Sequence, residues 1–180
     1  MKNNIRFLSL LTFSLCFILS ACAQNKTAKE PVIKKETTMK NPYYSRTSKE
    51  KLHVSDEAWK KVLPEDLYEV SRHADTERPF TGKYWNTDEK GTYYCAACGN
   101  KLFRSGAKFS SSCGWPSFFE QDSKTSVVYK DDNAYGMQRI EALCGRCGGH
   151  LGHLFDDGPA PTGKRYCMNS IALDFEPDNQ

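Results

Sequence analysis

The sequence predicts a mainly β domain with short helices at its start, preceded by an export segment and a linker. Beyond Pro79, short apolar runs alternate with glycine-containing segments, which is typical of short strands joined by turns. Residues 164–176 alternate in character residue by residue, as a strand does. The length of 180 residues suits one modest domain plus these two leading segments, and the aromatic content of 12% is enough to build a core.

The predicted helices are marked by their first residues. Ser55 precedes two acidic residues, which favours a helix capped by the Ser55 hydroxyl. Pro64, Glu65 and Asp66 open a second helix, which we expect to run to about Arg72. We expect strands at residues 92–94, 126–129, 134–143 and 164–176.

The first 21 residues have the pattern of a bacterial lipoprotein signal peptide. Lys2 and Arg6 precede an apolar run at residues 7–19, which is short for a membrane span and suits a signal core. The run ends in Leu-Ser-Ala before Cys22, which resembles a lipoprotein cleavage box. We therefore expect a signal peptide at 1–21 and lipidation of Cys22. An ordinary secretory signal cleaved near Ala21 or Ala23 is the alternative.

Three regions are expected: the signal peptide, a lipid-anchored flexible tether at 22–45, and a domain at 46–178. The tether is rich in Lys, Thr and Asn and shows no apolar period, so it buries too little surface to offset the entropy of ordering. More than one acyl chain would anchor the protein stably in the bacterial cell envelope. The mean hydropathy of −0.64 argues against several membrane spans. The net charge of +3 falls towards zero once Lys2 and Arg6 leave, which argues against nucleic acid as a partner. We expect a monomer.

Four of the eight cysteines form two matching Cys-x-x-Cys pairs, Cys95/Cys98 and Cys144/Cys147, each followed by glycine. Two such turns can present four thiolates to one tetrahedral Zn²⁺. The glycines suit tight knuckles that need unusual backbone angles. With 45 residues between the pairs, the metal would join two distant hairpins and would be structural. Redox motifs or structural disulfides are the alternatives in an exported protein.

Cys16 leaves with the signal and Cys22 is the expected lipidation site, so Cys113 and Cys167 remain. They could form a static disulfide or act as attacking and resolving thiols. In an extended strand, Arg165, Cys167 and Asn169 would share one face. A neighbouring guanidinium lowers a thiol pKa, and Asn169 could donate a hydrogen bond to a group held against the sulfur. A small buried side chain is the other interpretation of Cys167.

Two further segments favour chemistry over packing. Trp115 follows Cys113 closely and could form part of the core or wall a pocket for a methyl group. His150 and His153 lie in a glycine-rich loop; four cysteines would already saturate zinc, so acid–base work is the better use of these imidazoles. Asp157 could orient a histidine or make a turn.

These motifs, in this order, closely resemble methionine-R-sulfoxide reductase B over about residues 46–176: TERPFTG, YYCAACGNKLF, CGWPSF, GMQRIE, CGRCGGHLGHLFDDGP and PTGKRYCMNS. The resemblance implies a β-tent fold of two antiparallel sheets, one structural zinc and reduction of the R epimer of methionine sulfoxide. It implies that Cys167 is the catalytic nucleophile and Cys113 the resolving cysteine. It also implies that the remaining candidates surround the site: Trp115, His150, His153, Asp157, Arg165 and Asn169.

The expected chemistry is attack by Cys167 on the sulfoxide, formation of a sulfenic acid, and condensation with Cys113 to a disulfide. A thioredoxin-like donor would then reduce that disulfide, with oxidised proteins of the envelope as substrates. Two other functions fit parts of the pattern. A zinc-containing binding module would leave Cys113 and Cys167 without a task, and a simple thiol–disulfide oxidoreductase would not need Trp115 or the two histidines.

Overall fold

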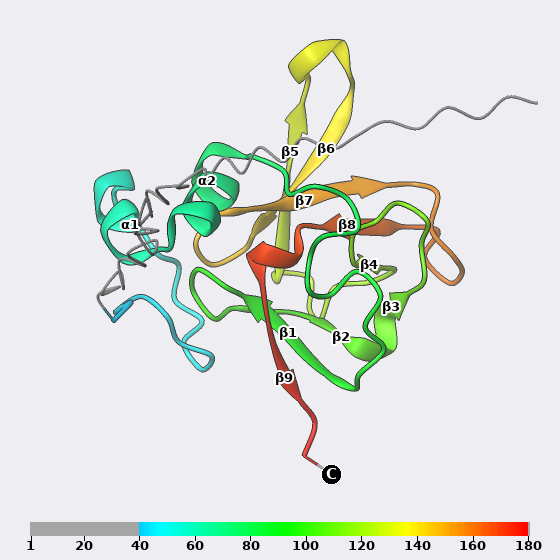
Figure 1. Cartoon of the computed structure of the whole chain (residues 1–180), viewed down its shortest axis with the longest axis horizontal. Helices are drawn as coiled ribbons and strands as arrows, with labels where there is room; N and C mark the ends of the chain where they lie inside the picture. The colour runs from blue at the N-terminus through cyan, green and yellow to red at the C-terminus, as the bar shows by residue number, and fades with distance from the viewer. Residues whose placement is uncertain (1–39, 180) are drawn as a thin grey trace, which may run out of the picture. The chain divides into compact units, whose positions relative to one another are not determined.

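The computed structural model describes residues 40–179, and the expected signal peptide, Cys22 and tether residues up to 39 lie outside them (Figure 1). Two α-helices come first, and strands and short 3₁₀ turns follow. The α-helices are α1 (Asp56–Val62) and α2 (Glu65–His73). The strands are β1 (Gly91–Cys95), β2 (Lys101–Arg104), β3 (Lys108–Phe109), β4 (Ser117–Phe118), β5 (Val127–Asp132), β6 (Arg139–Cys144), β7 (His150–Phe155), β8 (Arg165–Met168) and β9 (Leu173–Pro177). The 3₁₀ turns are η1 (Ser105–Ala107), η2 (Ala134–Gly136) and η3 (Ser170–Ala172).

The strands form two antiparallel sheets, which confirms the mainly β prediction. One sheet has three strands in the order β2-β1-β9. The other has six strands in the order β3-β4-β8-β7-β6-β5. Figure 1 shows β5 and β6 as a long hairpin that extends beyond the neighbouring strands. The fold therefore places β4, β8 and β7 side by side in the middle of the larger sheet.

Both predicted helices are present, and their ends follow the expected rules. The Ser55 hydroxyl accepts a hydrogen bond from the Ala58 amide at the start of α1. Acidic residues occupy the first turn of each helix, and basic residues the last, which complements the helix dipole. The α2 helix ends at Ala74, whose backbone is left-handed with φ of 56°.

Two predicted strands were wrong in extent. Residues 134–143 divide into the turn η2 and strand β6, which begins only at Arg139. The Asp132 carboxylate accepts a hydrogen bond from the Ala134 amide and thereby closes the turn before β6. Residues 164–176 divide into β8, η3 and β9, and the last of these joins the other sheet. A continuous face from residue 165 to 175 therefore does not exist.

Aromatic side chains fill the space between the two sheets. Phe103 of β2 stacks on Phe118 of β4 with ring centroids 4.3 Å apart. Tyr93 of β1 meets the same Phe118 edge-on at 5.0 Å. All three are fully buried, and each aromatic ring removed from water contributes about 1.5–3 kcal/mol. The core thus ties β4, which carries part of the candidate site, to the smaller sheet.

The segment just before residue 46, placed in the expected tether, contacts the domain where the structure describes it. Asn41 donates a hydrogen bond to the Ala97 carbonyl at 2.9 Å. The Tyr43 ring packs edge-on against buried Trp59 at 5.0 Å. The Arg146 guanidinium, itself buried, donates to the Tyr43 and Ser45 carbonyls. The packed region therefore begins before the expected boundary at residue 45.

Among residues 40–179, neither α-helix has the length and apolar character that a membrane span requires.

Candidate active site and four-cysteine cluster

Three neighbouring strands bring the central side chains together. Cys167 of β8 is paired with Ser117 of β4 on one side and His153 of β7 on the other. Directly opposed residues of antiparallel strands hold their Cβ atoms about 4.5–5.5 Å apart. The register of the sheet therefore places Cys167 between a hydroxyl and an imidazole, two groups that are far from it in sequence.

Cys113 reaches Cys167 from the loop between β3 and β4. Its Sγ lies 3.5 Å from the Cys167 Sγ, and both cysteines are free and half-buried. The Ser111 hydroxyl donates a hydrogen bond of 2.9 Å to the Cys113 sulfur. Gly114 then turns the chain with φ of 88°, a backbone angle that favours glycine. A disulfide needs the two sulfurs at about 2.05 Å, so a small shift of this loop would suffice to form one.

The two thiols differ in acidity. Burial raises the pKa of Cys167 to about 12, and the adjacent Cys113 adds to this rise. Burial also opposes ionisation of Cys113, but the Ser111 and Ser117 hydroxyls outweigh it and lower its pKa to about 7. The charge of Arg165 acts to lower the pKa of Cys167 without overcoming burial. Arg165 therefore acts on the Cys167 pKa in the expected direction, but burial outweighs it, and Cys113 is the thiol that ionises first.

A small cavity of about 150 Å³ opens at Cys167. Its walls combine apolar surface with a few polar groups. Trp115, Phe155 and Met168 provide the apolar side, and His153 and Asn169 lie among the polar lining residues. Trp115 is thus a cavity wall, as one of the two expectations had it, and not a buried core residue.

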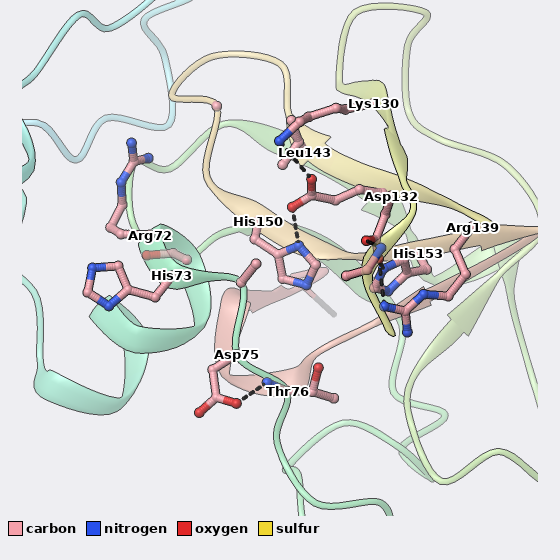
Figure 2. Close-up of a pocket in the computed structure, with 15 residues that line it drawn as sticks. Arg72, His73, Asp75, Thr76, Lys130, Asp132, Arg139, Leu143, His150 and His153 are labelled. Carbon is pink, nitrogen blue, oxygen red and sulfur yellow. Dashed lines mark hydrogen bonds and ion pairs between the residues drawn. The ribbon is translucent and has the colours of Figure 1, made fainter. Parts of the chain in front are cut away.

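The two histidines occupy different places. His153 lines the Cys167 cavity, and its Nε2 lies 2.9 Å from the Asp132 carboxylate, which in turn pairs with Arg139. The buried His150 does not line that cavity. Its Nδ1 lies 2.7 Å from Glu141, and its ring borders a neighbouring cavity of about 580 Å³, where Figure 2 shows it beside His153.

Charged neighbours of the histidines set their electrostatics. Burial lowers the pKa of His150, against the opposing effect of Glu141, so the imidazole is neutral at pH 7. Hydrogen bonds from the Ala134 amide and from His153 lower the pKa of Asp132 to about 2. Asp132 therefore stays ionised and fixes the orientation of the His153 ring.

Arg165 and Asp157 pair with each other at the rim of the site. The Arg165 Nε and one terminal nitrogen donate to the two Asp157 oxygens at 2.7 and 2.8 Å. The guanidinium carbon also lies 4.3 Å from the centre of the Phe155 ring. The sequence left open whether Asp157 orients a histidine or makes a turn; in the structure it holds Arg165, and the histidines are held by Asp132 and Glu141.

Asn169 and Trp115 are both fixed by Glu77. The Glu77 amide donates to the Asn169 side-chain oxygen at 3.1 Å, and the Glu77 carbonyl accepts from the Trp115 indole at 3.1 Å. The Glu77 carboxylate accepts from the Ser170 and Ile171 amides. This contact caps η3 and ends β8 directly after the Cys167 region. Since the Asn169 amide group also donates to the Leu151 carbonyl, both ends of this side chain are engaged within the protein.

The four remaining cysteines form a buried cluster, as the paired motifs predict. All four Sγ atoms lie within 4.8 Å of one another. Cys95 and Cys147 are 3.8 Å apart, and Cys98 and Cys144 are 3.6 Å apart. A tetrahedron with metal–sulfur bonds of about 2.3 Å has edges of about 3.8 Å, so these separations fit a metal site and are too long for disulfides.

The knuckle prediction is also confirmed. Gly99 and Gly148 have φ of 79° and 68°, and each amide donates to the carbonyl of the first cysteine in its motif. Cys95 ends β1 of the smaller sheet, and Cys144 ends β6 of the larger one. The cluster therefore links the two sheets.

Comparison with known proteins identifies the family. The model of the SelR domain matches residues 63–177. A "Peptide methionine sulfoxide reductase MsrB" of Methanosarcina barkeri is 55% identical over 126 residues, which are 70% of this chain and 89% of the relative. The protein of the same name in Agrobacterium fabrum is 51% identical over 127 residues, 71% of this chain and 94% of the relative. The chain belongs to the MsrB family. It is therefore an enzyme, a peptide methionine sulfoxide reductase of the oxidoreductase class.

Sequence reasoning about this reductase missed the side chains that support the candidate residues. Asp132 and Glu141 hold the histidines, Arg139 and Phe155 line the Cys167 cavity, and Glu77 fixes Trp115 and Asn169. A signal existed for four of them, because Glu77 lies in TERPFTG, Arg139 and Glu141 lie in GMQRIE, and Phe155 lies in CGRCGGHLGHLFDDGP. Asp132 could not be found in that way, since only the hairpin of β5 and β6 brings it to His153.

The order of the two thiol pKa values predicts which sulfur of the reductase reacts first with an alkylating agent. We expect iodoacetamide to modify Cys113 at a rate that rises between about pH 6 and pH 8, because its thiolate forms above a pKa of about 7. Cys167 should react more slowly throughout this range. Quenched aliquots analysed by mass spectrometry report both rates, and faster labelling of Cys167 would contradict the assignment.

Proposed function

We propose that the enzyme reduces the R epimer of protein-bound methionine sulfoxide, using Cys167 as nucleophile and Cys113 as resolving thiol. The observation that carries this proposal is the pair of free sulfurs 3.5 Å apart, with Cys167 in the wall of a small, partly aromatic cavity. A cavity of about 150 Å³ is below the range of sites for whole small molecules, so it suits a single side chain.

In the first step, the Cys167 sulfur attacks the sulfoxide and the oxygen passes to Cys167. The balance is one thiol plus one sulfoxide giving one sulfenic acid plus methionine, so the Cys167 proton finally resides on the sulfenic oxygen. Since this thiol is protonated at rest, it has to lose its proton during attack. The Cys113 thiolate, 3.5 Å away, is the nearest base, and His153 in the cavity wall can carry a proton towards the oxygen.

In the second step, Cys113, which has passed the proton it took from Cys167 on to the oxygen and is a thiolate again, attacks the Cys167 sulfur. A sulfur–sulfur bond forms, and the hydroxide that leaves takes up a proton to become water. The two electrons that reduced the sulfoxide have now come from the two thiols. A thioredoxin-like dithiol returns them by thiol–disulfide exchange and becomes a disulfide itself.

The surrounding residues take distinct roles in this proposal. Trp115 contacts the substrate methyl group, and its fixed indole allows one epimer to place its oxygen towards His153. Asn169 keeps the chain in position after Cys167, since its amide is bound to Glu77 and Leu151. His150 acts from the adjoining cavity through its packing against His153, whose ring centre is 5.4 Å away. Asp157 holds Arg165, whose charge favours a thiolate at position 167.

Substitution of each cysteine separates the two steps. We expect Cys167→Ser to abolish methionine formation, because no nucleophile remains in the cavity. Cys113→Ser should release about one methionine per enzyme and then stall with thioredoxin, because the sulfenic acid cannot become a disulfide. Methionine is quantified from each epimer of a sulfoxide peptide. Normal cycling of Cys113→Ser on thioredoxin, or equal use of both epimers by the wild type, would contradict the proposal.

We further propose that the four-cysteine cluster holds one structural Zn²⁺. Four buried thiolates at these separations match the preference of zinc for tetrahedral sulfur ligands. Four protein ligands leave no position for substrate, so the ion would supply cross-linking between the sheets and no chemistry at Cys167.

Loss of one ligand tests the zinc proposal. Cys98→Ser should lose the metal and lower Tm by roughly 10 °C or more, because metal binding contributes directly to folding free energy. Metal content is measured by mass spectrometry and Tm by calorimetry. Cys113→Ser is the matched control and should keep both values. A wild-type protein purified without zinc, or a Cys98→Ser variant with unchanged Tm, would rule out a structural zinc.

For the N-terminal region we propose export, removal of residues 1–21 and acylation of Cys22, which would hold the enzyme at the cell envelope where its protein substrates and a thioredoxin-like donor meet it. The support is the sequence pattern alone, since Cys22 lies outside the described residues.

Substitution of Cys22 tests the anchor. In cells grown with labelled palmitate, wild-type protein should carry label and sediment with membranes. Cys22→Ala should carry no label and lose membrane association, because no thiol remains for acylation. Cys16→Ala is the matched control and should behave as wild type, since that residue leaves with the signal. Labelled Cys22→Ala protein, or an unlabelled wild type, would refute the proposal.

A further inference from the structure

Phe80 combines an exposed aromatic ring with an unfavourable backbone. Phe80 is 54% exposed, which is the highest exposed fraction of any large apolar residue in the described part of the chain. Its φ is 65°, and within residues 40–179 only Ala74 shares a positive φ without being glycine. A bulky residue in this left-handed region of backbone angles is strained, and because the ring is exposed, its burial does not offset the strain. Backbone strain of this kind concentrates at functional positions.

The ring lies against the loop that carries Cys113. The Phe80 amide donates a hydrogen bond of 2.8 Å to the Gly114 carbonyl. A Cβ atom built on Gly114 would lie 2.7 Å from Pro79 and 3.0 Å from Cδ2 of the Phe80 ring. Glycine at 114 therefore allows close contact between this ring and the residue that follows Cys113.

Contacts on both sides of Phe80 hold it in this position. Its ring meets Trp85 edge-on, with centroids 5.3 Å apart. Three residues earlier, Glu77 is bound to Trp115, Asn169 and η3. The ring is thus presented on a fixed segment, although it is absent from the lining of the cavity at Cys167.

We propose that Phe80, together with the Gly114 backbone, forms the docking surface for the dithiol carrier protein that reduces the Cys113–Cys167 disulfide. This inference rests on the proposed function. In thiol–disulfide exchange, a carrier thiolate bonds to one enzyme sulfur and the enzyme S–S bond breaks. The second carrier thiol then displaces the enzyme, which leaves an enzyme dithiol and a carrier disulfide.

The chemistry of disulfide exchange favours the carrier over other occupants. The mixed disulfide requires a sulfur–sulfur bond of about 2.05 Å between the carrier and the half-buried cysteine pair. A protein surface held that close covers the residues next to Cys113, and Phe80 contacts that loop directly. A methionine sulfoxide side chain instead enters the cavity at Cys167, which Phe80 does not line. Aromatic residues, Phe among them, are enriched at protein interfaces.

The test is Phe80→Gly, because glycine removes the ring and favours the left-handed backbone, so folding is preserved. Turnover of an R-sulfoxide peptide is measured with two reductants, thioredoxin with its reductase and NADPH, or dithiothreitol. We expect KM for thioredoxin to rise about tenfold or more. The dithiothreitol-driven rate, KM for the peptide and the single-turnover yield of methionine should stay unchanged. Phe80→Tyr should retain wild-type KM for thioredoxin.

Val128→Ala provides the matched control. Val128 is also an exposed apolar residue, but it lies on β5, at the opposite edge of the larger sheet from β3 and β4, which flank the Cys113 loop. This variant should leave all rates unchanged.

Several outcomes would overturn the docking proposal. An unchanged KM for thioredoxin in Phe80→Gly would show that the ring does not bind the carrier. An equal fall in the thioredoxin- and dithiothreitol-driven rates would assign the ring to support of the Cys113 loop. A raised KM for the peptide with dithiothreitol would assign it to the substrate protein. Failure of the proposed function itself looks different, because the wild type would then form no methionine with either reductant.

Discussion

The four-sulfur cluster is the constraint on which the arrangement of the two sheets depends. It brings the end of β1 in the smaller sheet next to the end of β6 in the larger sheet. The Arg146 side chain, which belongs to one of its knuckles, binds the carbonyls of Tyr43 and Ser45 and fastens the start of the domain to the same point. Aromatic side chains fill the space between the two sheets, and β4, which is paired with β8, packs against this aromatic core through Phe118.

Some side chains of the site are positioned by the sheet, and others are positioned by loops. Register alone brings Ser117, Cys167 and His153 into one row, because these strands are direct neighbours. Loops add the groups that need freedom to move or to hydrogen-bond, namely Cys113 and Glu77. This division leaves the deeper thiol protonated and the loop thiol easily ionised, since burial dominates at Cys167 while the Ser111 and Ser117 hydroxyls stabilise the Cys113 thiolate.

Local patterns in the sequence predicted the helices, the knuckles, the clustering of four cysteines and the mainly β class. They succeeded because caps, glycine turns and paired cysteines act over a few residues. The prediction of one long strand at 164–176 was wrong. The sequence does alternate there, but the strand is interrupted at η3, where the amides are bound by the carboxylate of Glu77, almost a hundred residues earlier. The partners of the histidines were likewise out of reach, because Asp132 and Glu141 approach them only through a long hairpin. The motif gave the direction in which Arg165 shifts the Cys167 pKa, but it could not show that burial outweighs this effect, because burial is not visible in a motif.

The small volume of the cavity at Cys167 has a consequence for repair in the cell. A space of about 150 Å³ admits a side chain but no stretch of backbone, so an oxidised residue has to protrude from its own protein in order to enter. Under the proposed function, damaged residues on mobile loops or on partly unfolded chains are restored first. Oxidised residues that are packed inside folded proteins can enter only after local unfolding, so their rate of repair depends on the stability of the damaged protein.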